Sequence, residues 1–103
     1  MASWGVSEGE KLAVSAIAWS EFLNGPVTPS EIRDAFGILE GRIKDFGVAE
    51  AEMAASLYNQ TGRKRATRTD SFIAATAICA GSPLATLNKK DFVAYVAFGL
   101  QLI

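Results

Sequence analysis

The stretch RTDSFIAATAICAGSPLATLNKKDF, from Arg68 to Phe92, decides the fold because it predicts a helix, a short strand and a second helix in succession. Asp70 opens the first helix, which is apolar on nearly every side, and a Gly-Ser-Pro segment ends it. A short apolar strand over 84–87 precedes the second helix. Strand ends and helix starts meet at one edge of a parallel sheet, where open sheets bind ligands. We therefore expect Asp70 and Asp91 to lie at the same edge.

The residues before this stretch show a similar alternation of short apolar runs and helical patterns. Residues 11–15 predict a buried strand, and Ser15 is placed to cap a helix that runs to about Asn24. Thr28-Pro29-Ser30-Glu31 predicts the start of the next helix, because Thr and Glu three residues apart form a capping box around an N-terminal proline. The other predicted elements are a very short strand over 45–48, a helix over 50–61 and a last strand over 99–103.

Short apolar strands that alternate with helices are typical of a parallel sheet with helices on both faces. The chain has 103 residues, half of them apolar, which is enough for a core but not for two domains. We therefore expect a single α/β domain over residues 1–103.

The residue types that are scarce exclude several kinds of active site. The chain has no histidine and one cysteine, which excludes Ser-His-Asp and Cys-His catalysis and zinc sites built from histidine or several cysteines. A lone cysteine forms no disulfide within the chain, which suits a cytoplasmic protein. Cys79 lies in an apolar run, where we expect it to be buried. No apolar run reaches the roughly 18 residues of a membrane span.

Positive charge is concentrated in one segment, although the net charge is −1. Arg63, Lys64, Arg65 and Arg68 fall within six residues, and Lys89 lies beside the second acidic segment. Such a run is usually a solvated loop, but Lys and Arg also supply sequence-independent contacts to the phosphates of nucleic acids. The pattern leaves both interpretations open.

Three acidic residues are candidates for a shared site, and each also has a simpler explanation. Asp70 stands in the first turn of its helix, where exposed N–H groups favour a carboxylate. Asn88 and Asp91 have the spacing of a helix cap and its acidic partner. Glu21 lies off the apolar stripe of its helix, as a solvated charge does. Carboxylates that converge repel one another unless a cation is present, so a convergent arrangement would indicate a divalent metal ion.

Three segments resemble signature blocks of a known family. SAIAWSEFLNG (15–25), TDSFIAATAI (69–78) and ATLNKKDF (85–92) resemble three of the four blocks of PIN domains, and among these the VapC-type toxin ribonucleases. The resemblance covers residues 8–103, with the blocks in the family's order. It implies a PIN-like three-layer α/β/α fold with a parallel sheet.

The resemblance also implies an activity and a set of site residues. VapC-type proteins are toxins of toxin–antitoxin pairs, and they hydrolyse RNA with Mg²⁺ or Mn²⁺ held by acids at the sheet edge. By the motif match, Glu21, Asp70 and Asp91 are expected to be catalytic residues and metal ligands, with Asn88 as an assisting ligand and Thr86 as an accompanying hydroxyl. The residues expected to contact the RNA backbone are Arg63, Lys64, Arg65, Arg68 and Lys89. The family's partners are a small antitoxin protein and, commonly, a second copy of the toxin.

One block of the family has no counterpart here. The family begins with a strand that ends in an aspartate and lies in the middle of the sheet, and no segment before residue 11 resembles it. We therefore expect a PIN-like domain truncated at its N-terminus, unless another segment fills the gap. A gap would leave two unpaired strand edges, which favours a homo-oligomer. Without the first acid, two other functions stay open: a catalytically inactive PIN remnant that binds protein or dimerises, and an α/β interaction domain whose acids are all helix caps.

Overall fold

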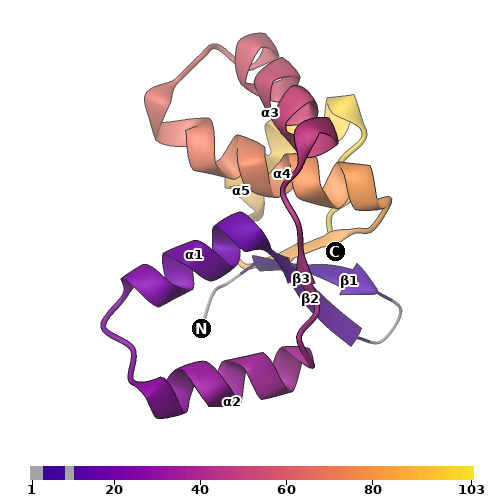
Figure 1. Ribbon diagram of the computed structural model, residues 1–103. Coiled ribbons are helices and arrows are strands. Elements are labelled where there is room, and N and C mark those ends of the chain that lie inside the picture. Colours follow the sequence, from indigo (N-terminus) through magenta and orange to yellow (C-terminus); the bar gives the residue numbers. More distant parts are fainter. Residues whose placement is uncertain (1–3, 9–10) are drawn as a thin grey trace.

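The computed structural model describes residues 4–8 and 11–103, which form a small sheet with helices packed against it (Figure 1). The strands are β1 (Trp4–Glu8), β2 (Lys11–Ser15), β3 (Ile43–Lys44) and β4 (Leu84–Thr86). The α-helices are α1 (Ala16–Asn24), α2 (Pro29–Leu39), α3 (Val48–Gln60), α4 (Arg68–Ala80) and α5 (Lys89–Phe92). Two 3₁₀ helices, η1 (Arg65–Thr67) and η2 (Val93–Phe98), precede α4 and follow α5. The predicted α/β class is confirmed in this coarse form.

The sheet is mixed rather than wholly parallel. Its strand order is β3-β2-β1-β4, with β2 and β3 parallel and β1 antiparallel to both of its neighbours. The prediction of a parallel sheet is therefore wrong for β1. The physical reason is the length of the connection. Two residues separate β1 from β2 in sequence, which is enough for a hairpin, whereas a parallel crossover needs about a dozen residues or more.

The segment that fills the middle of the sheet is β1, for which the sequence analysis predicts no strand. Val6 pairs with Ala13 of β2 on one side and with Leu84 of β4 on the other. Among the described strands, the place between β2 and β4 is therefore occupied by β1. The expected pair of unpaired edges is therefore absent within the described strands, and the argument from those edges to a homo-oligomer no longer applies.

The outer side of β4 is covered by the end of the chain. The Leu84 N–H donates to the carbonyl oxygen of Gln101 at 2.8 Å, and the Ile103 N–H donates to the carbonyl oxygen of Leu84 at 3.1 Å. The resulting bridge between Leu84 and Leu102 is parallel. The last strand that was predicted over 99–103 is thus reduced to one bridge, but it protects the edge of β4.

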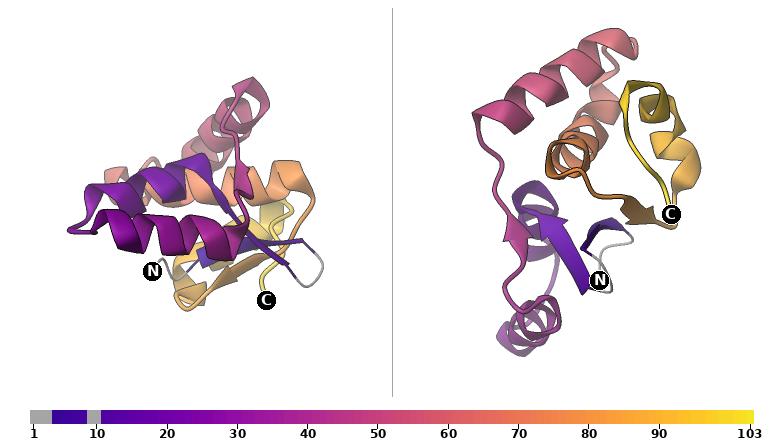
Figure 2. Two further views of the ribbon diagram at one scale, coloured as in Figure 1. Left: turned by 60° about the horizontal axis from the view of Figure 1, so that its bottom comes forward. Right: turned by 90° about the vertical axis from the view of Figure 1, so that its right-hand side faces the viewer.

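Two apolar clusters lie on opposite faces of β2, because successive side chains of a strand point to opposite sides. Ala13 belongs to a cluster with α3, α4 and the C-terminal segment, in which Leu57 is fully buried. Val14 belongs to a second cluster with Ala18 of α1 and Leu39 of α2. In Figure 2, α2 lies on the other side of the strands from α3 and α4.

The helix starts that were predicted from local signals are confirmed. The Ser15 hydroxyl accepts from the Ala18 N–H at 3.0 Å and begins α1. Thr28 Oγ1 accepts from the Glu31 N–H at 3.1 Å, and Glu31 Oε1 accepts from the Thr28 N–H at 3.0 Å, so the capping box of α2 is complete.

The helix end and the strand that follow α2 differ from the prediction. Glu40 and Gly41 have φ values of 52° and 71°, a left-handed conformation that ends α2 at Leu39. The next strand therefore lies at Ile43–Lys44 rather than at 45–48, and α3 already begins at Val48.

Candidate functional site

The three candidate acids come from three different elements, and two of them act on the third. Asp70 lies in the first turn of α4, Asp91 in α5 and Glu21 in α1. Burial raises the pKa of the half-buried Asp70 carboxyl, and the negative charges of Asp91 and Glu21 raise it further. The fold therefore brings Asp91 and Glu21, far from Asp70 in sequence, within electrostatic range of it.

Glu31, an acid in an equivalent helix position, shows that the pKa of Asp70 is not that of a helix-capping carboxylate. Glu31 and Asp70 are each the third residue of a helix, after the caps Thr28 and Thr67. Hydrogen bonds from the backbone and side chain of Thr28 lower the pKa of Glu31, as expected of a capping carboxylate. The pKa of Asp70 is shifted in the opposite direction, because burial and like charges outweigh the helix terminus. The surroundings of Asp70 thus disfavour its negative charge.

The turn after β4 is held by Thr86 rather than by a cap at Asn88. The Asn88 N–H donates to Thr86 Oγ1 at 3.0 Å, and Thr86 is only 7% exposed. The Asn88 side chain makes no capping hydrogen bond to α5, although the Asp91 N–H donates to the Asn88 carbonyl oxygen at 3.0 Å. The cap that was considered for this pair is therefore not formed, and the exposed Asp91 carboxyl is not a capping group.

The carboxylate oxygens of these acids are suitable ligands for a hard divalent cation, but they do not form a closed metal site. Among the residues in 4–8 and 11–103, no three acidic, cysteine or histidine side chains form a group that could hold a metal ion. Mg²⁺ prefers oxygen ligands, keeps several waters and is often bound through only one or two carboxylates. The carboxylates of Asp70, Asp91 and Glu21 therefore fit such an ion in their chemistry, with water in part of its coordination shell.

The predicted basic segment forms a tight turn between α3 and α4. Gly62 and Arg63 have φ values of 95° and 54°, and the left-handed backbone reverses the chain here. The Tyr58 hydroxyl donates to the Arg63 carbonyl oxygen at 2.7 Å, which ties this turn to α3. Arg68, at the start of α4, lies over the ring of the same tyrosine.

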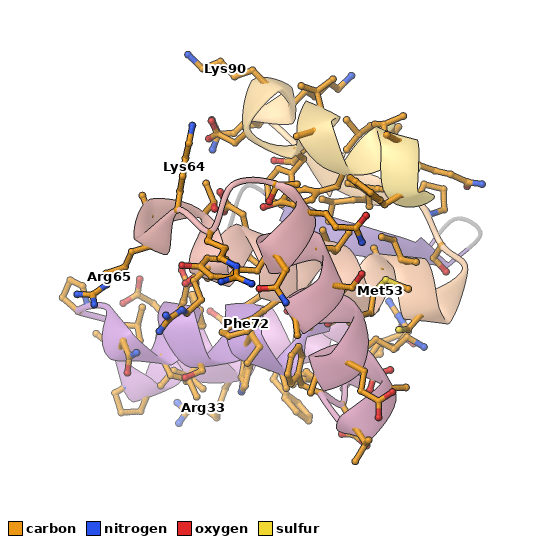
Figure 3. The ribbon with its side chains drawn as sticks, turned by 90° about the horizontal axis from the view of Figure 1, so that it is seen from above. Arg33, Met53, Lys64, Arg65, Phe72 and Lys90 are labelled. Atoms are coloured by element: carbon orange, nitrogen blue, oxygen red, sulfur yellow. The ribbon has the colours of Figure 1, made fainter. Side chains whose placement is uncertain are left out.

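The basic side chains of this turn are exposed and available to an anion. Within the described part of the chain, none of them forms an ion pair. Figure 3 shows Lys64, Arg65 and Lys90 extending outward from the body of the molecule, while Arg33 belongs to a different helix, α2. The basic residues concerned are Arg63, Lys64, Arg65, Arg68 and Lys89, all exposed.

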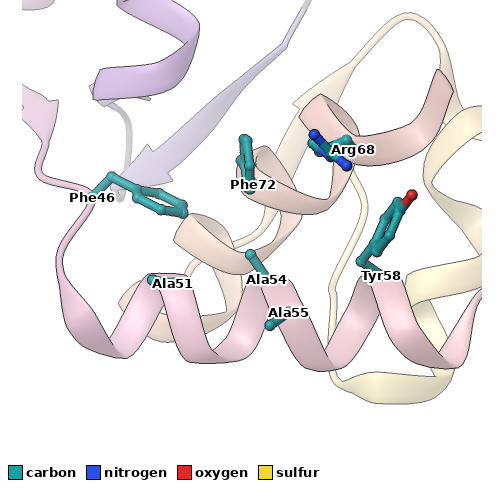
Figure 4. Close-up of a pocket in the computed structure, with 7 residues that line it drawn as sticks. All are labelled: Phe46, Ala51, Ala54, Ala55, Tyr58, Arg68 and Phe72. Carbon is teal, nitrogen blue, oxygen red and sulfur yellow. The ribbon is translucent and has the colours of Figure 1, made fainter. Parts of the chain in front are cut away.

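An apolar cavity of about 370 Å³ lies between α3 and α4 and was not foreseen (Figure 4). Its lining residues are Phe46, Ala51, Ala54, Ala55, Tyr58, Arg68 and Phe72. The alanines at three- and four-residue spacing on α3 could have indicated this cavity from the sequence, because small side chains on one face leave room beside a neighbouring helix. None of the three acids is among these lining residues, so the cavity is distinct from the candidate site.

Cys79 is exposed, and the expectation that it belongs to the core is wrong. It lies in the last turn of α4, where the apolar pattern runs round the whole helix and does not show which side meets the core. Burial raises the pKa of its thiol, and so do the charge and a hydrogen bond of the Glu50 carboxylate.

No protein-family model, curated protein or solved structure matches the chain. The assignment of a function therefore rests on the geometry of its own residues. No helix in the described ranges is both long and apolar enough to cross a membrane.

Proposed function

We propose that this chain is a metal-dependent endoribonuclease with a PIN-like three-layer fold, related to the VapC-type toxins. The observation that carries the proposal is the electrostatic coupling of Asp70 with Asp91 and Glu21. These three acids are the ones that the motif match selects, and they come from three separate elements. If the three acids were unrelated helix caps, there would be no reason for Asp91 and Glu21 to lie within electrostatic range of Asp70.

The three carboxylates have the chemistry needed to bind Mg²⁺ or Mn²⁺. When bound, such an ion supplies an activated water and stabilises negative charge on an RNA phosphate. In this proposal Asp70, Asp91 and Glu21 would hold the ion, in part through waters of its coordination shell, and Asn88, after β4, would assist them. Asp70 is the central residue, because it is the one whose carboxyl both of the others influence.

The basic turn supplies the second part of the proposal, which is affinity for the RNA backbone. Its exposed arginines and lysine precede Asp70 by only a few residues. Such contacts attract phosphates without selecting a base sequence. Arg63, Lys64, Arg65, Arg68 and Lys89 are therefore proposed to orient the RNA strand toward the acids.

A VapC-type function also implies partners and a compartment. We propose a small antitoxin protein, self-association into a homo-oligomer, and a cytoplasmic location as parts of the same hypothesis. The exposed apolar side chains on α2, Phe36 at 50% and Ile38 at 67%, are available for a protein contact.

The test is cleavage of a fluorescently labelled RNA by the purified full chain in the presence of Mn²⁺. We expect cleavage that is abolished by EDTA and by Asp70→Asn. Glu31→Gln is the matched control, because it also neutralises an acid at the third position of a helix, and it should leave the rate unchanged. Cleavage that survives EDTA, or equal rates in the two variants, would falsify the proposal.

A second candidate function is a catalytically inactive module that binds protein or dimerises, and one observation favours it. β1 occupies the middle of the sheet but runs antiparallel to its neighbours, so that Trp4 pairs with Thr86 at the end of β4. The family's strand would end in an aspartate at this edge, whereas Glu8 lies at the other end of β1. Absence of Mn²⁺ binding, together with a stable dimer in light scattering, would support this alternative.

A further inference from the structure

Two buried hydroxyls and one backbone carbonyl oxygen form a cluster beside the first turn of α4. The hydroxyls of Tyr95 and Ser71 lie 3.1 Å apart. Both are within hydrogen-bond distance of the Thr67 carbonyl oxygen, Ser71 at 3.1 Å and Tyr95 at 3.4 Å. Tyr95 is 2% exposed and Ser71 is fully buried, so water does not compete for these contacts.

The cluster joins the two segments that carry Asp70 and Asp91. Ser71 follows Asp70 in the first turn of α4. Tyr95 lies in η2, which continues directly from α5, four residues after Asp91. The contact between the two hydroxyls therefore ties the segment of one acid to the segment of the other.

The segment that carries Asp91 depends on such contacts for its position. α5 has only four residues, and a helix of one turn has little stability of its own. Phe92 anchors it in the core at 2% exposure, with its ring centroid 6.2 Å from that of Tyr95. Apolar packing of this kind is non-directional, whereas a hydrogen bond specifies an orientation. The burial of Phe92 thus holds α5 against the core without specifying its orientation, and the Tyr95 hydroxyl contact can supply that orientation.

We propose that Tyr95 is a positioning residue of the candidate site, which sets the separation of the Asp70 and Asp91 carboxylates through its hydroxyl contact with Ser71. The metal-binding part of this inference rests on the proposed function. The geometric part does not, because it concerns the placement of α5 against α4 in the metal-free chain.

The experiment uses two variants that each remove one hydroxyl, Tyr95→Phe and Ser71→Ala. Thr76→Val is the matched control, because Thr76 is 2% exposed on the same helix and its hydroxyl donates to a carbonyl four residues earlier, that of Phe72 at 3.0 Å. Ser71 makes the same kind of bond to Thr67 but also contacts Tyr95. Three quantities are measured for each protein: the free energy of unfolding in urea, Mn²⁺ affinity by electron paramagnetic resonance, and residual dipolar couplings of the metal-free chain.

We expect Tyr95→Phe and Ser71→Ala to remain folded and to bind Mn²⁺ about tenfold more weakly, as is typical when a residue that orients metal ligands is changed. The dipolar couplings of residues 89–92 should no longer fit the orientation of α4. Thr76→Val should change the free energy of unfolding but neither of the other quantities.

The inference is overturned if both hydroxyl variants keep the wild-type orientation of α5, whatever happens to metal binding. If the orientation changes while the wild-type chain itself binds no Mn²⁺, the positioning role stands and the proposed nuclease function fails. If only one of the two variants fails to fold, the other still decides the question, because each removes the same contact from one side.

Discussion

The guanidinium carbon of Arg68 lies 5.6 Å from the centroid of the Tyr58 ring, and the hydroxyl of that ring donates to the Arg63 carbonyl oxygen at 2.7 Å. One aromatic side chain of α3 therefore holds both ends of the basic turn. A cation over an aromatic face is held without losing its charge, so it remains able to attract an anion. This arrangement favours a rigid, positively charged surface over a merely solvated loop.

The first prediction concerns RNA binding by this turn. Replacing Arg63, Lys64 and Arg65 together by alanine should weaken RNA binding and flatten its salt dependence. The slope of log affinity against log salt should fall by about 1 for each lost phosphate contact. Fluorescence anisotropy at several salt concentrations measures the slope. Arg33→Ala, which removes one exposed cation on a different helix, α2, should leave it unchanged; a third of the triple variant's loss there would show that only net charge matters.

The second prediction concerns the pH dependence of stability. Because the pKa of Asp70 is raised in the folded state, that state holds the proton more tightly than the unfolded chain does. The stability that this group contributes is present below its unfolded pKa and is lost as the pH rises through its folded pKa. At neutral pH, Asp70→Asn should therefore increase the free energy of unfolding, by no more than about 1 kcal/mol because water screens a half-exposed carboxyl.

Urea denaturation of the wild type and Asp70→Asn between acidic and neutral pH measures this effect. The two curves should converge in acid, where the wild-type carboxyl is protonated and resembles the amide. A variant that is less stable than the wild type at neutral pH would mean that Asp70 acts as a stabilising cap after all.

The third prediction concerns the reactivity of Cys79. Burial and the Glu50 carboxylate raise the pKa of its thiol, so less of the reactive thiolate is present near neutral pH. Alkylation should therefore be slower than that of a cysteine in a short peptide, despite the exposure of Cys79. Glu50→Gln should accelerate it severalfold, because the amide removes the charge but keeps an oxygen for the Gly47 N–H. Mass spectrometry of iodoacetamide labelling gives the rates; identical rates would contradict the contact.

The fourth prediction tests whether the two apolar clusters are independent. Ile73 is 2% exposed in the cluster beside α3 and α4, and Ile43 packs against the cluster beside α1 and α2. Ile73→Val should cost about 1 kcal/mol and Ile43→Val less, because Ile43 is only partly buried. The two losses should add to within about 0.5 kcal/mol, since the residues share no partner. A larger departure in urea denaturation would show that the clusters behave as one core.

The sequence predicted best those features whose causes are local. The caps at Ser15 and Thr28 use side chains and N–H groups three residues apart, so the sequence contains the whole interaction. The end of α4 follows in the same way from Gly81, whose φ of 65° ends the helix.

The features that the sequence did not predict depend on contacts between distant segments. β1 contains a glycine and two polar residues among five, and its pairing with both β2 and β4 makes it a central strand. The exposure of Cys79 depends on how far α3 covers α4, which no local pattern contains. For the candidate site, the motif match named three acids, of which Asp91 and Glu21 lie within electrostatic range of Asp70, but the contact between Tyr95 and Ser71 had no counterpart in the sequence pattern.

The placement of β1 has a consequence for the order in which the protein assembles on the ribosome. β1 and β2 follow each other in sequence and can form their hairpin as soon as both have been translated. The pairing of Trp4 with Thr86 has to wait until residue 86 has emerged, so the hairpin keeps one open side until then. The nascent chain therefore exposes a strand edge that the finished protein hides, and this is the stage at which a chaperone or a neighbouring nascent chain can bind it.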